Sequence, residues 1–250
     1  MYLNIVLYKT YANLKSEIDK TYLGCIWWVL EPVINTAVFY FIFVYILKNR
    51  TENFVVFLYI GMAVYGWFSG GIQAGANSIL AHSGLMQQIW LPKALFPFIS
   101  ITNVSWKFLF SLLVLLPLLW WHHAPISWAY LALPFLFLIQ YTIIVFVSMP
   151  LAGLIPYFQD GKTVLSTVLG VLMWLSGVFY GRERIPDSIE PWFYLNPIAA
   201  MIEAFRTILV DGHWPRWDIL GKAMILPLIA CVLGVAFLKH VDRKITKLPM

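Results

Sequence analysis

Six apolar runs constrain this chain more than any other feature of its sequence. An α-helix needs about 20 mostly apolar residues to cross the hydrocarbon core of a bilayer, which is about 30 Å thick. Short polar connections separate most of the runs, so we expect an all-α polytopic membrane protein with six transmembrane helices. The predicted spans are residues 26–47, 54–71, 101–121, 129–153, 164–180 and 221–238.

The composition is that of a protein lying almost wholly within a membrane. Hydrophobic residues make up 61% of the 250 residues and charged residues 12%, whereas a soluble domain has about 25% charged residues. No polar stretch approaches the roughly 50 residues that a small soluble domain requires. We therefore expect residues 1–250 to form a single transmembrane domain.

Several kinds of site have no counterpart in the sequence. The loop Gly-x-x-x-x-Gly-Lys-Ser/Thr, which binds nucleotide phosphates, does not occur. The two cysteines, Cys25 and Cys231, lie near opposite ends of the chain rather than in a metal-binding pattern. We predict no catalytic residues, metal or cofactor in this chain, and no binding to nucleic acid.

The distribution of charge predicts the orientation in the membrane. An even number of spans places both termini on one side, and most basic residues gather on that side: Lys9, Lys15, Lys20, Lys93, Lys107, Lys162, Lys239, Arg243, Lys244 and Lys247. The long connection on the other side mixes basic with acidic residues. Because basic residues are retained in the cytosol, we expect both termini to be cytosolic.

The long connection on the opposite side, residues 182–217, contains a helix that is too short to cross. Apolar residues recur there at helical spacing: Ile198, Met201, Ile202, Phe205, Ile208 and Leu209. The helix would have about 13 residues and a length of about 20 Å. Lipid does not tolerate broken backbone of this kind unless protein or a cavity surrounds it. We therefore expect an outer re-entrant helical hairpin beside a transport pathway.

Residues 1–25 form an amphipathic lead before the first span. One apolar stripe runs through them: Leu3, Leu7, Tyr11, Leu14, Ile18 and Tyr22. This pattern predicts a helix that lies in the membrane interface rather than crossing the bilayer. A simple surface anchor explains the helix equally well.

The longest predicted cytosolic connection is residues 72–100. A short helical pattern around residues 79–89 ends before Pro92 and Pro97. Such an element can dock on a cytosolic partner, or it can simply pack against the neighbouring spans.

Aromatic residues make up 17% of the chain. Interfacial belts and lipid-facing side chains account for many of them. The alternative is a corridor whose rings stack on the C–H faces of sugars, since stacking can hold a sliding polymer without locking it. The candidate channel residues are Trp27, Trp28, Tyr40, Tyr59, Trp67, Trp174, Phe179 and Tyr180.

Three passages resemble a known family. They are YLGCIWWVLEPVINTAVFYFIF, LMQQIWLPKALFPF and IPDSIEPWFYLNPIAAMIEAFRTIL. Their order and spacing resemble the permease subunits of type 2 ABC transporters that export bacterial polysaccharides such as O-antigen, capsule or teichoic acid. The most specific residues are Leu23, Gly24, Trp27 and Pro32 in the first passage, and Tyr194, Asn196 and Pro197 in the third.

The resemblance implies a homodimeric channel in the bacterial cytoplasmic (inner) membrane. Two copies of a separate subunit would bind ATP and Mg²⁺, so this chain would be a transport subunit and not an enzyme. Coupling to that subunit would use Gln87, Gln88, Lys93 and Asp160. The family often has an arginine directly before the aspartate that corresponds to Asp160, whereas this chain has Gln159 there. The hairpin would form an outer gate with Tyr194, Asn196, Pro197, Glu203 and Arg206.

The expected cargo is a lipid-linked polysaccharide. Its phosphate carries charge that cannot enter hydrocarbon unaided, and four lysines on the entrance side could receive it: Lys9, Lys15, Lys20 and Lys107. One alternative is a type 2 ABC exporter of drugs or small lipids. Another is a membrane-embedded glycolipid-modifying transferase, which requires converging acid, base or metal ligands that the sequence does not show.

Overall fold

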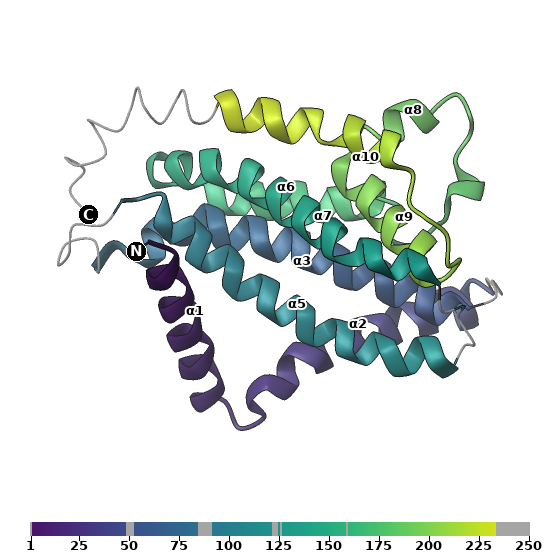
Figure 1. Cartoon of the computed structure of the whole chain (residues 1–250), viewed down its shortest axis with the longest axis horizontal. Helices are drawn as coiled ribbons and strands as arrows, with labels where there is room; N and C mark the ends of the chain where they lie inside the picture. Colours follow the sequence, from purple (N-terminus) through teal and green to yellow (C-terminus); the bar gives the residue numbers. More distant parts are fainter. Residues whose placement is uncertain are drawn as a thin grey trace.

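The structure is a computed structural model that describes residues 2–48, 53–84, 92–121, 125, 127–158 and 160–233. All regular elements within these residues are helical. The long helices run side by side along the longest axis of the molecule, and α1 lies across one end of them (Figure 1). The predicted all-α polytopic membrane protein is therefore confirmed at the level of fold class.

Four helical stretches are long and apolar enough to cross a membrane. The first is Gly24–Ile46, which comprises η1 (Gly24–Ile26), α2 (Trp27–Tyr40) and η2 (Phe41–Ile46). The second and third are α3 (Phe54–Ala81) and α5 (Leu95–Trp121). The fourth, Trp128–Tyr157, comprises η3 (Trp128–Ala132), α6 (Leu133–Leu154) and η4 (Ile155–Tyr157).

The fifth and sixth predicted spans differ from these four. Helix α7 (Gly161–Leu175) has 15 residues, so it ends before Tyr180, the predicted end. The reason is Gly177, whose φ of +70° is the left-handed conformation in which helices stop. Helix α10 (Trp217–Ala223) is followed by helical residues 225–233, and the remainder of the sixth run lies outside the described residues. Six spans therefore remain a prediction.

Helix α3 is the centre of the subunit. Its side chains form most of the buried core, and it packs against α2, α5, α6 and the short helix α9 (Pro197–Leu209). Glycines allow the closest of these contacts. A Cβ atom placed on Gly71 would lie 2.8 Å from Ile144, and one on Gly75 would lie 2.7 Å from Ser148. The pair Gly71 and Gly75 thus brings α3 against α6 within one subunit.

The second predicted span ends too early, and the third begins too late. Helix α3 continues past residue 71 because Ile72, Ala76 and Ile79 extend its buried stripe. Helix α5 begins at Leu95 because Pro97 lies in its first turn, where a proline is tolerated. The connection between these helices is consequently much shorter than residues 72–100.

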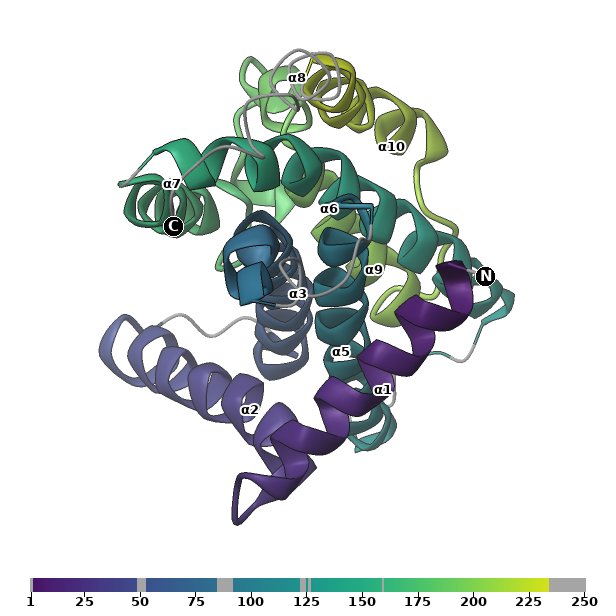
Figure 2. The ribbon, with the colours of Figure 1, turned by 90° about the vertical axis from the view of Figure 1, so that its left-hand side faces the viewer.

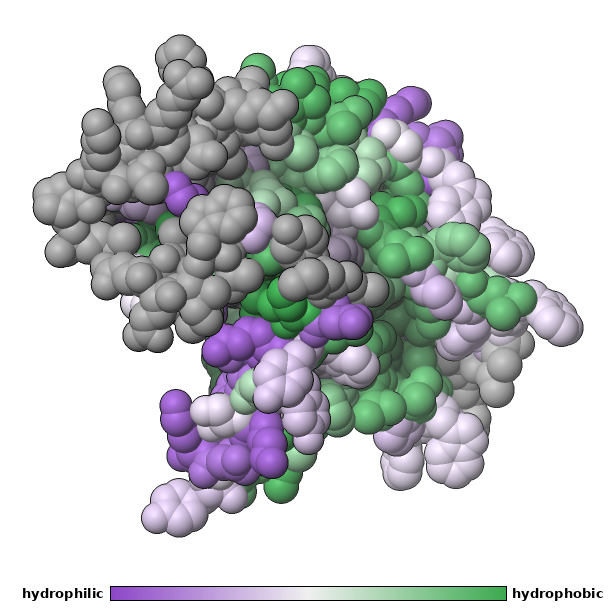
Figure 3. Space-filling model, turned by 60° about the vertical axis from the view of Figure 1, so that its left-hand side comes forward, coloured by the Kyte–Doolittle hydropathy of each residue, from purple (hydrophilic) through white to green (hydrophobic). Residues whose placement is uncertain are grey.

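Helix α1 (Tyr2–Asp19) crosses the end of the bundle at which α3 ends and α5 begins. Figure 2 shows it running in front of the other helices when the molecule is viewed from that end. Val6 and Thr10 are buried on its inner side. The second half of α1 forms the hydrophilic area at the lower left of Figure 3, beside apolar surface. This arrangement suits a helix in the membrane interface, which remains a prediction.

Candidate functional site

The segment of residues 176–209, most of which the sequence predicts to face outward, begins directly after α7 and is built around α9; we call it the outer segment. It contains a turn at residues 176–181, η5 (Arg182–Arg184), α8 (Glu190–Phe193) and α9. Helix α9 starts at Pro197 because the Asn196 side chain accepts a hydrogen bond from the backbone N–H of Ile198 at 3.2 Å, and proline suits the first helical position. Helices α8 and α9 lie at the opposite end of the bundle from the start of α1 (Figure 1).

Although α9 has only 13 residues, almost all of its surface is covered. Buried positions occur on every side of the helix: Ile198, Ala199, Ala200, Met201, Ile202, Ala204, Phe205, Arg206, Ile208 and Leu209. The helix packs between α3, α6 and α10. The predicted length of about 13 residues is confirmed, and the residues that cover the helix belong to neighbouring protein elements.

Arg206 joins α9 to two other elements. Its Nε and Nη2 donate to the carbonyl oxygen of Phe57 at 3.2 and 3.0 Å, in the first turn of α3. Its Nη1 donates to Gly177 and its Nη2 to Val178, both at 2.7 Å, in the turn after α7. The guanidinium also lies 3.3 Å from the centre of the Phe57 ring. A single side chain therefore ties α9 to the first turn of α3 and to the turn that follows α7.

This arginine remains a cation. Burial lowers the pKa of Arg206 to about 9, and the nearby Glu203 carboxylate opposes that shift. A pKa of about 9 leaves the guanidinium protonated at neutral pH. Its hydrogen bonds to carbonyl groups are therefore charge-assisted, which makes them stronger than bonds between neutral groups.

A polar network lies beside the middle of α9, at Glu203. Glu203 accepts a hydrogen bond from the Tyr194 hydroxyl, and its other oxygen lies 2.5 Å from Arg216 Nη2. Arg216 also donates to the Tyr194 hydroxyl at 3.2 Å. Glu190 connects this group to Arg182, at 2.8 Å, and approaches Arg216 at 3.7 Å. The network links α8, α9 and the residue that precedes α10.

Tyr194 acts in this network as a hydrogen-bond donor. Burial raises the pKa of Tyr194, and its hydrogen bond to the Glu203 carboxylate raises it further. The phenol is therefore protonated at neutral pH. The sequence singled out Tyr194 and Glu203 but not Arg216, Glu190 or Arg182, although the mixture of acidic and basic residues in this connection was visible.

The five predicted gate residues are brought together around α9. Tyr194 and Glu203 contact each other, and Asn196 donates through Nδ2 to Ser176 Oγ at 2.9 Å. Pro197 is the first residue of the helix, and Arg206 holds its second half. Two of these residues, Asn196 and Arg206, contact the turn that follows α7. Their role in gating remains a prediction.

The eight aromatic residues predicted to line the channel lie in different parts of the subunit. The ring centre of Phe179 lies 4.6 Å from that of Trp174, and the Phe179 ring also contacts Phe39 of α2. The Tyr180 hydroxyl donates to the Trp174 carbonyl at 3.1 Å. These residues form one cluster at the C-terminal end of α7. Tyr40 is near Tyr45, with ring centres 6.3 Å apart.

Two other aromatics are core residues of the subunit. Tyr59 and Trp67 are each 2% exposed. The Tyr59 hydroxyl donates to the Ser111 carbonyl at 2.8 Å, and the Trp67 ring stacks against those of Phe108 and Phe137. Neither ring has a face open to a sugar in this conformation. The predicted aromatics therefore do not form one continuous surface within the subunit.

Trp28 and Lys107 meet at the junction of α1, α2 and α5. Lys107 Nζ lies 2.5 Å from Glu17 and 5.7 Å from the centre of the Trp28 ring. Trp28 Nε1 donates to the same carboxylate at 3.4 Å. A lipid phosphate would therefore have to compete with Glu17 for Lys107. Trp27, by contrast, is 47% exposed.

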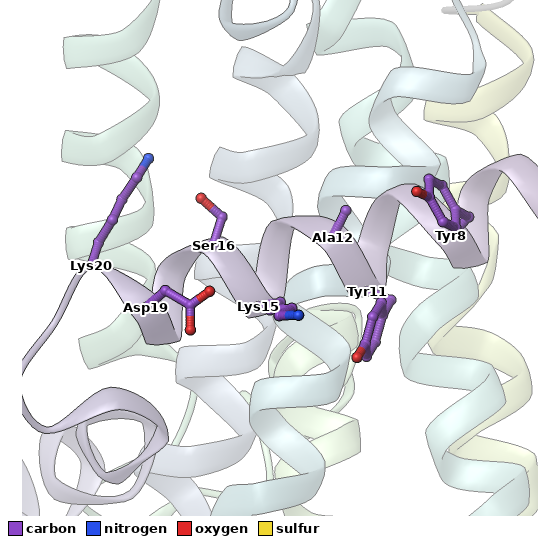
Figure 4. Close-up of a pocket in the computed structure, with 7 residues that line it drawn as sticks. All are labelled: Tyr8, Tyr11, Ala12, Lys15, Ser16, Asp19 and Lys20. Carbon is purple, nitrogen blue, oxygen red and sulfur yellow. The ribbon is translucent and has the colours of Figure 1, made fainter.

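The face of α1 that points away from the bundle carries a shallow groove of about 410 Å³, which we call the outward groove of α1. Its lining consists of Tyr8, Tyr11, Ala12, Lys15, Ser16, Asp19 and Lys20, all from this helix and drawn in Figure 4 in front of the bundle. Two of the four predicted phosphate-binding lysines, Lys15 and Lys20, thus share one surface. Lys9 is half-buried and does not line the groove.

The predicted coupling residues are only partly described. Gln87 and Gln88 lie outside the described residues. Lys93 lies just before α5, and Asp160 directly precedes the first residue of α7. Helices α3, α5 and α7 all begin or end at this end of the bundle (Figure 1). Across the described ranges, no three His, Cys, Asp or Glu side chains cluster as metal ligands.

Comparison with known families decides the class of protein. The ABC-2 type transporter family matches this chain over residues 8–210, which include most of α1, all of α9 and the polar network up to Glu203. The chain belongs to the ABC-2 type transporter family. This ABC-2 permease is therefore a transporter subunit, and membership implies a separate ATP-binding subunit as its partner.

Similar proteins cover nearly the whole chain. The O-antigen export system permease protein RfbA of Klebsiella pneumoniae is 22% identical over 229 residues, which are 91% of this chain and 88% of the relative. The protein of the same name from Myxococcus xanthus is 24% identical over 86% of this chain and 83% of its own length. The polysialic acid transport protein KpsM of Escherichia coli is 24% identical over 90% and 88%.

Proposed function

We propose that two copies of this ABC-2 permease form a conduit through which a lipid-linked polysaccharide leaves the cytosol across the bacterial inner membrane. A pair of separate ATP-binding subunits would supply the energy. The names of the similar proteins support this cargo, because they refer to the export of O-antigen and the transport of polysialic acid. The proposed topology has six spans, with both termini in the cytosol.

The observation that carries the proposal is the position of α9. A helix of 13 residues is too short to cross the membrane, yet it is buried between membrane-crossing helices and tied by Arg206 to the outer ends of α3 and α7. Protein contacts of this kind are what a re-entrant hairpin needs. A displacement of α3 relative to α7 would pull on both sets of hydrogen bonds and move α9. The outer segment is therefore suited to open and close with the spans.

The cytosolic end would receive the cargo and the ATP-binding subunit. Lys15 and Lys20 on the outward groove of α1 carry the positive charge that a lipid phosphate requires. The residues between α3 and α5, together with Asp160 before α7, would contact the ATP-binding subunit. Binding of ATP there would shift the packing of the spans as rigid elements.

Deletion of the gene, followed by complementation, tests this function. We expect deletion to remove the polysaccharide from the cell surface and to leave polymer accumulating in the cytosol. Complementation with the intact chain should restore the surface polymer. Normal surface polysaccharide combined with increased sensitivity to toxic small molecules would instead favour an exporter of drugs or small lipids.

A further inference from the structure

A second cavity lies between α1, α5 and α6 and shares no lining residue with the groove on α1 that contains Lys15 and Lys20. Its volume is about 580 Å³, which falls within the roughly 300–1,000 Å³ typical of ligand pockets. Its walls are mostly apolar, with Leu7 from α1, Phe98, Trp106 and Leu109 from α5, and Leu138 from α6.

The polar side chains in the walls already have partners. Thr102 Oγ1 and the Tyr141 hydroxyl are hydrogen-bonded to each other at 3.0 Å, and Thr102 also donates to the Phe98 carbonyl. Ser105 Oγ accepts from Trp67 Nε1 at 3.0 Å and donates to the Ile101 carbonyl. No charged side chain is among the described lining residues. The cavity therefore offers a ligand apolar contact and little hydrogen bonding.

The cavity is lined mainly by α5 and α6, two helices that belong to stretches long and apolar enough to be candidates for membrane spans. The lining residues Trp106 and Leu138 are 44% and 60% exposed, so the cavity opens sideways rather than into the core. A bilayer chain can enter this opening without leaving its apolar surroundings.

Charge is present at the end of the cavity that α1 closes. Val6 lines this end, and Lys9 lies three residues further along the helix, where side chains are neighbours on one face. Lys9 is also the only charged residue of α1 before Lys15. A lipid phosphate at the membrane interface would find its counter-ion here.

We propose that this cavity binds one acyl chain of an anionic phospholipid from the leaflet that carries α1, with the phosphate beside Lys9. The lipid fills the space between α1, α5 and α6 and so fastens the first half of α1 to the bundle. Glu17 and Lys107 fasten its second half. This assignment does not depend on which cargo is exported.

The proposal is tested with a phosphatidylglycerol that carries a photoactivatable diazirine within one acyl chain. The full-length permease is reconstituted in phosphatidylcholine vesicles containing this probe, and labelled peptides are mapped by mass spectrometry. We expect labels on the lining residues of α5 and α6. Leu138→Trp, which fills the cavity, should lower this labelling by about tenfold, since it displaces buried methylene groups.

Leu113→Trp is the matched control because Leu113 is 59% exposed on α5 but lies outside the cavity. It should leave the labelling of the lining unchanged. Equal labelling in the two tryptophan variants would mean that lipid contacts the surface without a site, and would overturn the proposal. If Leu138→Trp fails to fold, Leu109→Trp provides the same comparison.

A second comparison tests the position of the phosphate. Lys9→Gln should reduce the preference for phosphatidylglycerol over a phosphatidylcholine probe by about fivefold. Lys162→Gln, at the exposed start of α7, should leave this lipid preference unchanged. An unchanged preference in Lys9→Gln would overturn the assignment of the phosphate.

Two further outcomes would assign the cavity to another occupant. Displacement of the probe by a polyprenyl phosphate, but not by unlabelled phosphatidylglycerol, would identify the transported lipid as the ligand. Efficient disulfide formation between two Leu138→Cys subunits, in a chain lacking Cys25 and Cys231, would show that a second copy covers the opening. Either result would overturn the phospholipid proposal.

Discussion

Arg206 shows how one residue can determine the position of a short helix in a membrane bundle. Its guanidinium donates to carbonyl groups of Phe57, Gly177 and Val178, which belong to two different elements. Only the planar fork of an arginine can reach acceptors in several directions from a fixed position. The carbonyl groups of Gly177 and Val178 lie in a turn, beyond the end of the regular hydrogen bonding of α7. Arg206 therefore supplies donors to backbone that would otherwise be poorly satisfied.

Arg206→Lys should destabilise the permease and impair export. A lysine cannot bond all three carbonyl groups at once, and each buried carbonyl left without a donor costs about 1–3 kcal/mol. Arg182→Lys is the control, because Arg182 is 50% exposed and its pair with Glu190 contributes at most about 1 kcal/mol. Thermal unfolding of the purified proteins measures the difference. Equal losses of stability in the two variants would contradict the assigned role of Arg206.

The lysines of the proposed cytosolic entrance should not be equivalent. Lys15 and Lys20 share the outward groove of α1, whereas Lys107 is paired with Glu17. We expect the double variant Lys15→Ala and Lys20→Ala to lower the amount of polysaccharide on the cell surface more than Lys107→Ala does. Immunoblotting of surface polymer at matched protein levels measures this. A larger defect in Lys107→Ala would move the entrance to the junction of α1 and α5.

Residue-level contacts were the least predictable part of the chain. Tyr59 and Trp67 are aromatic residues in apolar helices, as Trp174 is, and nothing in the sequence indicates that the first two are buried. The partners of Arg206 are backbone carbonyl groups, which have no sequence signature. Glu17 and Lys107 are 90 residues apart, so their pairing depends on how α1 folds back on α5.

At the scale of elements, the contact of α3 with α6 depends on two glycines. Gly75→Ala should destabilise the protein, because its Cβ would lie 2.7 Å from the Ser148 Cβ. Gly66→Ala, on the same helix, meets nothing within 4 Å, and replacing a helical glycine by alanine stabilises by about 0.5–1 kcal/mol. The two variants should therefore change the melting temperature in opposite directions. A similar loss of melting temperature in both variants would contradict this account, because it would show that the close contact of Gly75 with α6 is not what makes the glycine necessary.

Element boundaries were predictable where a residue type imposes them. Asn196 and Pro197 specify the start of α9, because one caps the helix and the other suits its first position. The end of α7 was missed, since Phe179 and Tyr180 are apolar enough to continue a span although Gly177 turns the chain. The end of α3 was missed because Gln73 and Asn77 lower the hydropathy of a helix whose other face remains buried.

At the scale of the whole molecule, the apolar runs were sufficient to predict a polytopic helical bundle. They could not predict the arrangement of the helices around α3, which follows from side-chain packing. Helix α3 has 28 residues and a length of roughly 42 Å, which exceeds the hydrocarbon core of about 30 Å. The bundle must therefore project beyond the core, and α1 lies across one end of it.

The central claim is that the segment from η5 to α9 faces the outside of the cell and covers the conduit. Single cysteines replace Asp187, in the outer segment, and Lys162, at the start of α7, in a chain lacking Cys25 and Cys231; both positions are exposed. A membrane-impermeant maleimide is then added to intact cells. The account predicts labelling at position 187 without permeabilisation and labelling at position 162 only after it. The reverse pattern, or labelling of both positions in intact cells, would contradict the proposed topology and with it the assignment of the outer gate.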